Sequence, residues 1–501
     1  MKIFILYETY NIEFFGKYIL GKYLISKIKQ PIKVYIGFYR DLILKIYKCK
    51  PNEKVIIIGN QIYSSNKVLI DFYKYNNFYF YPQHEEEHSL FSVNKKNYLN
   101  NLIKRKYFFR FKKYLCFNNE TKKIFKNFLN LNDDRFQVVG NAKYDFLDFL
   151  KNSKNFSRSL IKYHSKYILV ALPDSFFKNA LIYINERKEN SKISINHKYD
   201  TIIGNRSRNE QISLYYYMKS FLKNISILAK NNKKYQIVLR PHPSDYEHLD
   251  KLKKSFKNIK NIKINTNHQI YHWIKNSEFV ICSPASPVID SSILKKKVVC
   301  FYDKSNKFHK FIFSKHPSLK FKKMKILKNF SNFSIKNLKK NSSIPIVSSN
   351  ILPPNKPHYK SVYEELSKIN FKKKEINIFF HDLMFKKVIK FIEKQKKVGD
   401  YGIEGAKKFN SKFKFSIQRF LVIIFFWNNP LKFDFLNILR KFTLGRSYTI
   451  ADLGEWHGGL NQKIDIKSLI KFDNHFKKIF KFFKESKVTI IGKKVLILKK
   501  L

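Results

Sequence analysis

The feature that most constrains this fold is an alternation of short apolar runs with helix-like stretches along the first 305 residues. Apolar runs arranged in this way are typical of strands buried on both faces of a parallel sheet. The runs fall into two series, which begin at KIFILYE (2–8) and at YILVALP (167–173). We therefore expect two α/β halves. The remaining runs are KVYIGF (33–38), KVIIIGN (54–60), LIDFYKY (69–75), FYFYP (78–82), KYLCFN (113–118), FQVVGN (136–141), YQIVLRP (235–241), FVICSP (279–284) and VVCFYD (298–303).

The length and local composition suggest where the domains begin and end. A chain of 501 residues is too long for one compact core. We expect an N-terminal domain over 1–150, a Lys-, Asn- and Ser-rich linker over 151–166 and a second domain over 167–385. Residues 386–501 read as a mainly helical extension that ends in a closing strand pair, VTIIGKKVLILKK.

The charge of the chain is strongly positive, with 99 Lys and Arg against 37 Asp and Glu. The lysines are scattered along the whole length instead of forming one arm or stripe. Lys, Asn, Ile, Phe and Tyr are also enriched together, as in A/T-rich coding sequences. We therefore treat nucleic acid as an unlikely partner. An anionic membrane surface or an anionic sugar nucleotide fits this charge at least as well.

The sequence also bears on compartment and membrane association. The four cysteines form no CxxC pair and no zinc-like spacing, which fits a reducing cytoplasm. The N-terminal stretch carries Glu8 and Glu13, unlike the apolar core of a signal peptide. The longest apolar run, FLVIIFFW (420–427), is far shorter than the roughly 20 residues of a membrane span. We expect a cytoplasmic protein, peripheral at most on the inner face of the membrane.

The first candidate motif is VLRPHPSDY (238–246), at the end of an apolar run. Arg240 offers a planar two-pronged donor to a phosphate, and His242 offers a further donor or a proton. The prolines on either side fix the backbone around them. A surface turn after a strand is the alternative reading of the same residues.

The second candidate motif is SEFVICSPASPVIDSSILKKKVVCFYD (277–303), which reads as strand, turn, helix and strand. Ser283 and Ser286 lie where the helix begins, and free backbone N–H groups there favour an anion. Asp290 follows one turn later on the same helix, in a position that suits a sugar or ribose diol. An ordinary helix cap with an exposed acid is the alternative. We expect the two motifs on successive strand ends of one sheet.

Together the motifs resemble the GT-B glycosyltransferases of bacterial surface polysaccharides. The likeness is to surface carbohydrate biosynthesis proteins, with CDP-glycerol glycerophosphotransferases and polysialyl- and Kdo-transferases as relatives. VVGNAKYDFLD (138–148) resembles the family segment Val-x-Gly-Asn-Pro-Arg-x-Asp, and QHEEEHSLF (83–91) resembles its acidic loop. The resemblance covers about residues 1–305. Ala142 and Lys143 depart from the family's Pro and Arg, and Glu85 and His88 depart from its Asp and Gly.

The resemblance implies an α/β, GT-B-like fold: two facing Rossmann-like domains with a mainly helical C-terminal extension. The C-terminal domain would hold a nucleotide-activated sugar, and the N-terminal domain a glycan or lipid-linked acceptor. One carboxylate of the acidic loop would be the general base, and His242 is a further catalytic candidate. No cofactor or bound metal is expected. The acidic-loop candidates are Glu85, Glu86 and Glu87, and the donor-binding candidates are Arg240, His242, Ser283, Ser286, Asp290, Gly140 and Asn141.

Two other classes of protein fit the same residues. A sugar-nucleotide 2-epimerase also has two Rossmann-like domains. A non-catalytic, basic scaffold of the polysaccharide machinery at the membrane surface would keep the fold without the reaction. Turnover of a nucleotide sugar excludes the scaffold, and transfer to an acceptor without isomerisation excludes the epimerase.

Overall fold

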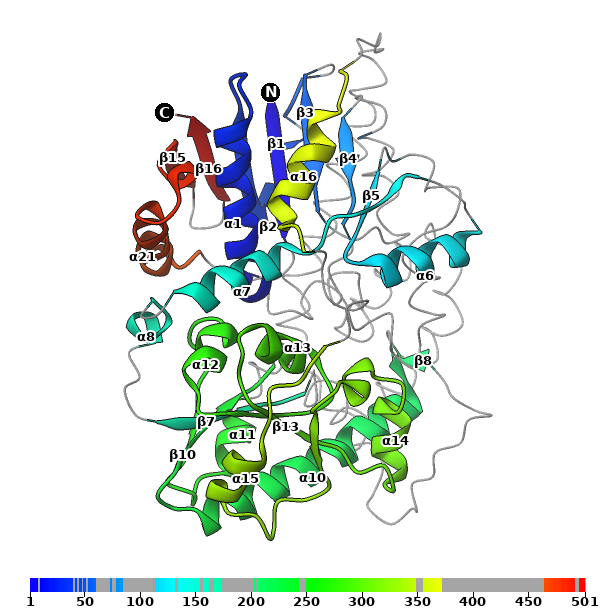
Figure 1. The fold of residues 1–501 in the computed structure, drawn as a ribbon, viewed down its shortest axis with the longest axis vertical. Helices are drawn as coiled ribbons and strands as arrows, with labels where there is room; N and C mark the ends of the chain where they lie inside the picture. Colours follow the sequence, from blue (N-terminus) through cyan, green and yellow to red (C-terminus); the bar gives the residue numbers. More distant parts are fainter. Residues whose placement is uncertain are drawn as a thin grey trace, which may run out of the picture.

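The computed structural model describes residues 1–59, 73, 78–83, 111–130, 134–173, 202–242, 249–347, 355–371 and 464–500. Short gaps within these ranges fall at 8–9, 39–40, 43–44, 47, 51–52, 112, 154–155, 162–165, 204–205 and 492–494. The described elements form two α/β bodies, one above the other in Figure 1, each with its own sheet. No single sheet runs through the described part of residues 1–300, in agreement with the two halves expected from the sequence.

The N-terminal sheet is parallel at its centre. Its strand order is β15-β16-β2-β1-β3-β4, and β2, β1, β3 and β4 run parallel to one another. Every residue of β3 is buried, and β1 is buried beyond its first residue, because helices cover the sheet. The strands are β1 (Lys2–Tyr7), β2 (Lys33–Phe38), β3 (Val55–Ile58) and β4 (Tyr79–Tyr81), with the separate pair β5 (Tyr114–Cys116) and β6 (Phe136–Val138).

The C-terminal segment of the chain returns to the N-terminal sheet. This return was not predicted from the sequence. The closing strand pair is confirmed, because β15 (Ser486–Ile491) and β16 (Val495–Lys500) form an antiparallel hairpin. β16 also pairs antiparallel with β2, so the hairpin extends the sheet at its edge. Helix α21 (Ile466–Lys477) and the short η7 (Lys481–Phe483) lie beside it (Figure 1). The part of 386–501 that the structure describes therefore packs on the N-terminal body.

The C-terminal sheet is parallel throughout, with strand order β11-β10-β7-β12-β13-β14. Numbered along the chain, this is the order 3-2-1-4-5-6 of a Rossmann domain, which reverses direction between its first and fourth strands. Here the reversal falls between β7 and β12. The strands are β7 (Tyr167–Ala171), β10 (Gln236–Arg240), β11 (Ile262–Ile264), β12 (Val280–Cys282), β13 (Val298–Phe301) and β14 (Lys325–Leu327), with a small hairpin of β8 (Ile202–Ile203) and β9 (Arg206–Ser207).

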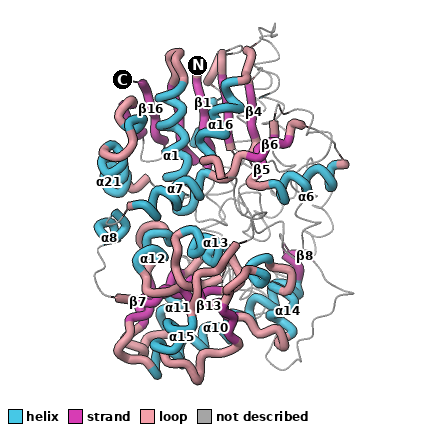
Figure 2. Tube along the Cα trace, viewed as in Figure 1, coloured by secondary structure: helices cyan, strands magenta, loops and turns pink. Residues whose placement is uncertain are grey.

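The helices follow the expected alternation with the strands (Figure 2). The fold class predicted from the sequence, two Rossmann-like domains of mixed α/β structure, is confirmed by these two strand orders. Of the apolar runs, LIDFYKY lies outside the described residues except for Tyr73. The helices are α1 (Tyr10–Lys27), α6 (Asn119–Leu129), α7 (Ala142–Asn152), α8 (Phe156–Ile161), α10 (Arg208–Asn231), α11 (Leu249–Ser255), α12 (Ile270–Asn276), α13 (Ser286–Ile293), α14 (Lys307–Phe313), η5 (Pro317–Lys320), α15 (Ile335–Asn341) and α16 (His358–Ser367).

Two helices connect the bodies. Helix α7 lies between the two sheets in Figure 1 and packs on α1, where a Cβ on Gly16 would lie 2.1 Å from the carbonyl oxygen of Ala142. Only glycine allows that approach, so α7 sits directly against the N-terminal layer. The chain then passes through α8, inside the expected linker, into β7. Helix α16 returns the chain from the C-terminal body to α1 and α7.

Candidate functional site

The two motifs flank β7 at the carboxyl end of the C-terminal sheet. Arg240 pairs with Ala171 on one side of β7, and Cys282 pairs with Ala171 on the other. The expectation of successive strand ends therefore needs correction, because β7 separates β10 from β12 by two strand spacings, about 10 Å. The correction brings the second motif to the point where strand order reverses. Rossmann-type sheets bind their ligands at that point.

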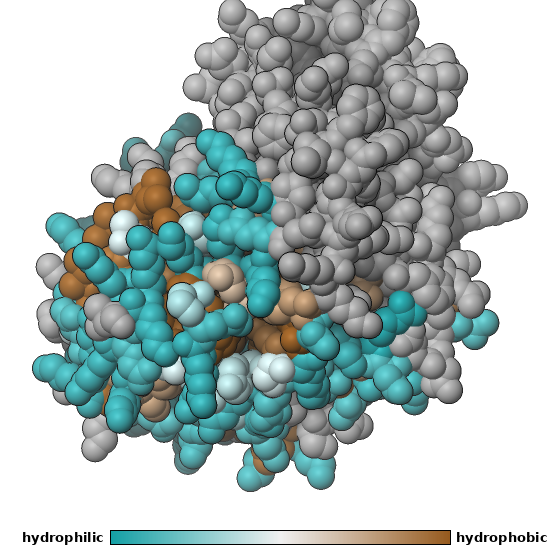
Figure 3. All heavy atoms as spheres, turned by 90° about the horizontal axis from the view of Figure 1, so that it is seen from above, coloured by the Kyte–Doolittle hydropathy of each residue, from teal (hydrophilic) through white to brown (hydrophobic). Residues whose placement is uncertain are grey.

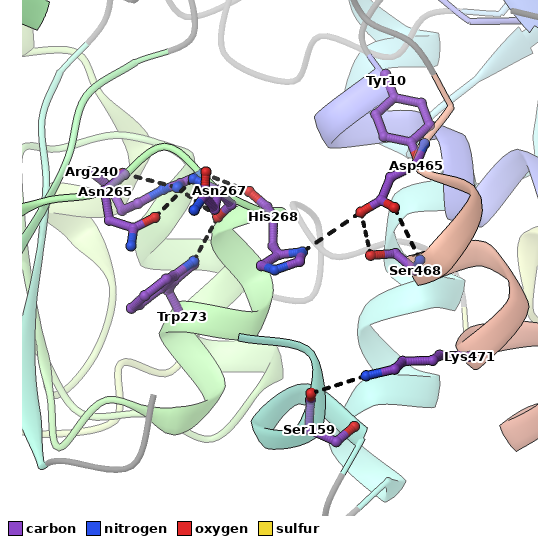
Figure 4. A network of polar contacts seen from close by, with 10 residues as sticks. All are labelled: Tyr10, Ser159, Arg240, Asn265, Asn267, His268, Trp273, Asp465, Ser468 and Lys471. Carbon is purple, nitrogen blue, oxygen red and sulfur yellow. Dashed lines mark hydrogen bonds and ion pairs between the residues drawn. The ribbon is translucent and has the colours of Figure 1, made fainter. Parts of the chain in front are cut away.

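The Arg240 side chain is turned into the protein instead of toward solvent. It is 3% exposed. Its guanidinium donates to the carbonyl oxygens of Asn265 at 2.9 Å, Asn267 at 2.8 Å and His268 at 2.7 Å (Figure 4). The Trp273 indole N–H donates to the Asn267 carbonyl at 2.9 Å. Arg240 therefore fixes the loop that follows β11.

That loop reaches across to the N-terminal body. His268 has a left-handed backbone, φ 57°, and its Nδ1 lies 4.0 Å from a carboxylate oxygen of Asp465 (Figure 4). Gln269 donates its amide N–H to the carbonyl oxygen of Tyr10 at 3.2 Å, and the Tyr10 hydroxyl accepts the backbone N–H of Asp465 at 2.9 Å. The first motif thus supports, through its loop, a contact between the two bodies.

The second motif has a different local structure. Ser283 follows β12, is 1% exposed and hydrogen-bonds the Tyr217 hydroxyl of α10. Ser286 is the first residue of α13, as expected, and is partly exposed. The N-cap residue is Ala285, and no side chain caps the helix. In the first turn Pro287 has no N–H, and the Val288 N–H donates to the carbonyl oxygen of Ala285 at 3.1 Å. The start of α13 therefore offers an anion the Ser286 N–H and the positive end of the helix.

Asp290, expected to hold donor hydroxyls, faces the N-terminal body in this structure. Its carboxylate lies 2.8 Å from the ammonium of Lys143 on α7, and the two side chains are 3% and 7% exposed. The Lys143 ammonium also lies 5.2 Å from the Tyr144 ring centroid and 5.8 Å from that of Tyr271. This buried ion pair joins α13 to α7. Its role toward a ligand stays a prediction.

The segment that resembles the family's Val-x-Gly-Asn-Pro-Arg-x-Asp builds this junction residue by residue. Gly140 has φ 83°, a conformation that favours glycine. The Asn141 side chain caps α7 by accepting the Lys143 backbone N–H at 2.8 Å. Asp145 accepts the backbone N–H groups of His358 and Tyr359, both at 2.9 Å, and so caps α16.

Asp145 is a residue whose part in the site region the sequence reading did not assign. Burial raises the pKa of its carboxyl to about 7, against the lowering effect of the two N–H donors. His358 is buried beside it and stays neutral, because burial holds the pKa of the imidazole well below its usual range. The sequence did contain a signal for Asp145. It occupies the last position of the segment that resembles Val-x-Gly-Asn-Pro-Arg-x-Asp, which places an acid one turn into α7.

The acidic-loop candidates Glu85, Glu86 and Glu87 lie outside the described residues. The structure does place Gln83, just before them. Gln83 is fully buried; its amide nitrogen lies 2.9 Å from Nε2 of His358 and 3.4 Å from the carbonyl oxygen of Gly140. Lys17 donates to its carbonyl oxygen at 3.3 Å. Gln83 therefore lies against α1 and against the residues that begin α7 and α16. His242 is partly buried and lies in the turn after β10, two residues beyond the end of the strand.

The described residues do not form a cysteine nucleophile, a metal site or a membrane-spanning helix. Cys49, Cys116, Cys282 and Cys300 are all buried free thiols, and burial raises the pKa of each, which disfavours the nucleophilic thiolate. Within the described ranges, no three His, Cys, Asp or Glu side chains come together as a metal site would require. None of the helices described has the length and apolarity needed to cross a bilayer.

Comparison with known proteins gives structural neighbours only. No protein-family model matches the sequence, and no curated protein matches it. A UDP-GlcNAc 2-epimerase from Methanocaldococcus jannaschii, in complex with UDP-GlcNAc and UDP, aligns at 13% identity and TM-score 0.41, covering 73% of this chain and 99% of that one.

Two further neighbours have similar scores. The wall teichoic acid polymerase TagF, in a structure with CDPG, aligns at 12% identity and TM-score 0.40, covering 79% of this chain and 89% of that one. MnaA from S. aureus, in a structure with UDP, aligns at 11% identity and TM-score 0.43, covering 75% and 100%. All three TM-scores lie below 0.5, so the fold assignment rests on the strand order and not on these neighbours.

Proposed function

We propose that this chain is a glycosyltransferase-like enzyme of bacterial surface polysaccharide synthesis. It transfers a sugar, or a glycerol-phosphate-like group, from a nucleotide donor to a glycan or lipid-linked acceptor. The observation that carries the proposal is the start of α13, a helix without a side-chain cap at the reversal point of a Rossmann sheet. A nucleotide diphosphate is the anion that such a place suits.

The proposed reaction divides its work between the bodies. The acceptor hydroxyl oxygen forms a bond to the transferred group, and the bond from that group to the donor phosphate oxygen breaks. The Ser286 N–H and the positive end of α13 stabilise the charge that develops on the departing phosphate, and His242 is a further candidate donor. A carboxylate among Glu85, Glu86 and Glu87 takes the acceptor's proton.

The proposal assigns different work to the buried charges. Arg240 supports the site by holding the loop from Asn265 to His268, because its guanidinium already serves three carbonyls. Lys143 and Asp290 set the position of α13 against α7. A lipid-linked acceptor would also bring this cytoplasmic enzyme to the inner face of the membrane as a peripheral protein.

A donor screen tests the proposal. The full chain is titrated with CMP-, CDP-, UDP- and GDP-activated donors, and each reaction is analysed for free nucleotide and for isomerised donor. We expect one nucleotide class to bind, with release of nucleotide that depends on an added acceptor. Isomerisation without release would identify an epimerase, and the absence of binding to all four classes would overturn the proposal.

A further inference from the structure

The edge of the C-terminal sheet carries a long stretch of sequence without acidic residues. No Asp or Glu occurs between Asp303 and Glu364, whereas lysines recur throughout. The structure describes residues 304–347 and 355–363 of this stretch, and the first of these parts forms α14, η5, β14, α15 and the segment after α15. This part of the surface is therefore positively charged unless acidic side chains from other elements lie beside it.

Three exposed isoleucines lie on this edge. Figure 3 views the molecule from above, where hydrophilic side chains cover much of the described surface and apolar ones lie between them. Among the described residues, six large apolar side chains are exposed, and three of them lie here: Ile326, Ile344 and Ile346 are 37%, 40% and 47% exposed. The Ile346 N–H donates to the Lys322 carbonyl at 2.8 Å, and Ser343 pairs with Val298 at the start of β13. β14, which carries Ile326, pairs with the same strand. The isoleucines thus share one edge of the sheet.

Exposed lysines lie on the same segments and on the neighbouring helix α15. Lys322, Lys323 and Lys328 flank β14 and are exposed, and Lys336 and Lys340 are exposed on α15. Among the described residues, the acid that an ion pair brings to this edge is Glu278, which is 14% exposed and lies 3.2 Å from Lys339. We call residues 322–328 together with 344–346 the β14 surface. It combines aliphatic side chains with an excess of positive charge.

We propose that the β14 surface docks on a bilayer that contains anionic lipid. Isoleucine side chains enter the boundary between headgroups and acyl chains, while the lysines attract anionic headgroups, each by about 1 kcal/mol. A single-stranded nucleic acid is a poorer fit, because it is bound by stacking on aromatic rings, and Phe321 and Phe330 beside β14 are buried. The inference deepens the proposed function and rests on it, since it supplies the face that would meet a membrane holding a lipid-linked acceptor.

Vesicle sedimentation tests the proposal without turnover. The full chain is mixed with vesicles of phosphatidylcholine alone or of phosphatidylcholine and phosphatidylglycerol in equal amounts. We expect binding only to the anionic vesicles, and weaker binding in high salt. Two variants examine the surface: Ile326→Ser/Ile344→Ser/Ile346→Ser and Lys322→Gln/Lys323→Gln/Lys328→Gln. Each should reduce partitioning at least tenfold.

Matched controls come from α21 and the turn after it, on the other body. Ile470 and Ile479 are 53% and 54% exposed, and Lys467, Lys471 and Lys478 are exposed beside them. Ile470→Ser/Ile479→Ser and Lys467→Gln/Lys471→Gln/Lys478→Gln should change partitioning less than twofold.

Several results would overturn the docking proposal. They are the absence of binding to anionic vesicles, equal losses in the control variants, and binding of a single-stranded RNA oligonucleotide tight enough to displace the chain from vesicles. Vesicle binding by a chain that binds no nucleotide donor would leave the docking surface in place and remove the proposed function.

Discussion

The turn after β10 and the turn after β12 lie on either side of β7, and they use their polar groups in opposite ways. The β10 turn directs its one strong donor, Arg240, into the protein, where three carbonyl oxygens accept it. The β12 turn leads into a helix that no side chain caps. Equivalent places in one sheet thus hold a structural clamp and an uncapped helix start, which we propose as the anion site. A charged residue in a sequence motif therefore does not by itself indicate whether the residue holds the fold together or binds a ligand.

The largest expected effect concerns the ion pair that ties the β12 helix to the other body. Lys143→Met leaves the Asp290 carboxylate buried without that ammonium, so we expect the free energy of unfolding to fall by about 3–5 kcal/mol. Denaturant titration measures it. The double variant Lys143→Met/Asp290→Leu should recover much of the loss. Lys253→Met breaks the exposed pair with Asp250 and serves as the control, with an expected loss below about 1 kcal/mol. Equal losses in both single variants would remove the distinction.

The next effect separates the clamp from a ligand donor. Arg240→Lys keeps the charge, but one ammonium cannot serve three carbonyls in different directions. We expect the free energy of unfolding to fall by about 2–4 kcal/mol, because buried acceptors lose a charged donor. His242→Ala, on the same turn but less buried, should cost about 1 kcal/mol or less. Unchanged stability in Arg240→Lys, together with weaker donor binding, would show that the guanidinium serves the ligand.

A smaller effect is the response of the clamped loop to acid. His272, in α12 directly behind the loop, is 1% exposed, and burial lowers the pKa of its imidazole from 6.5 to about 3. Between these values the unfolded chain binds a proton that the folded chain does not. Burial of neutral His272 therefore does not reduce the free energy of unfolding above pH 6.5. As the pH falls from 6.5 towards 3, it reduces the free energy of unfolding by about 1.4 kcal/mol per pH unit. Unfolding measured from about pH 7 to about pH 4 should show a shallower slope in His272→Gln, and an unchanged slope would count against the burial argument.

The smallest effect adds a cap to the β12 helix. Ala285→Asp provides the N-cap acceptor that α13 lacks, so we expect an increase of about 1 kcal/mol in the free energy of unfolding. Thermal unfolding measures the gain. A loss of stability would indicate that the first turn already has partners there.

The fold was predictable because strands that are buried on both faces of a sheet have continuous apolar sequences, and such runs can be recognised in the chain. The strand that ends in VLR and the strand before SPAS are both where the sequence places them. Their separation by β7 was not predictable, since strand order in a sheet depends on contacts between distant segments. For the same reason the sequence could not show that β16 pairs with β2, or that Lys143 reaches Asp290.

The elements around the candidate site were predictable from the sequence, but the hydrogen-bond partners of its side chains were not. Ser286 begins its helix as expected, and Gly140 and Asn141 shape the link between the bodies. The partners of Arg240 are backbone carbonyl oxygens in the loop after β11. Every residue has such a carbonyl, so the amino-acid sequence does not indicate which ones accept a hydrogen bond. Glu85, Glu86 and Glu87 remain candidates on the sequence alone.

Nucleotide titration of the Ala285→Asp variant tests the central claim most directly. Calorimetry compares the wild-type chain, this variant and Lys295→Gln/Lys297→Gln, each titrated with UDP, CDP, GDP and CMP. If the donor phosphates lie at the start of α13, the wild-type chain binds one nucleotide class at one site. The carboxylate introduced at the N-cap accepts the Val288 N–H and places a negative charge where the phosphate would bind. It therefore weakens that binding at least tenfold, although the variant is the more stable protein. The lysine variant should stay within about threefold of the wild type, since exposed charges contribute little. Wild-type affinity in Ala285→Asp would contradict the account.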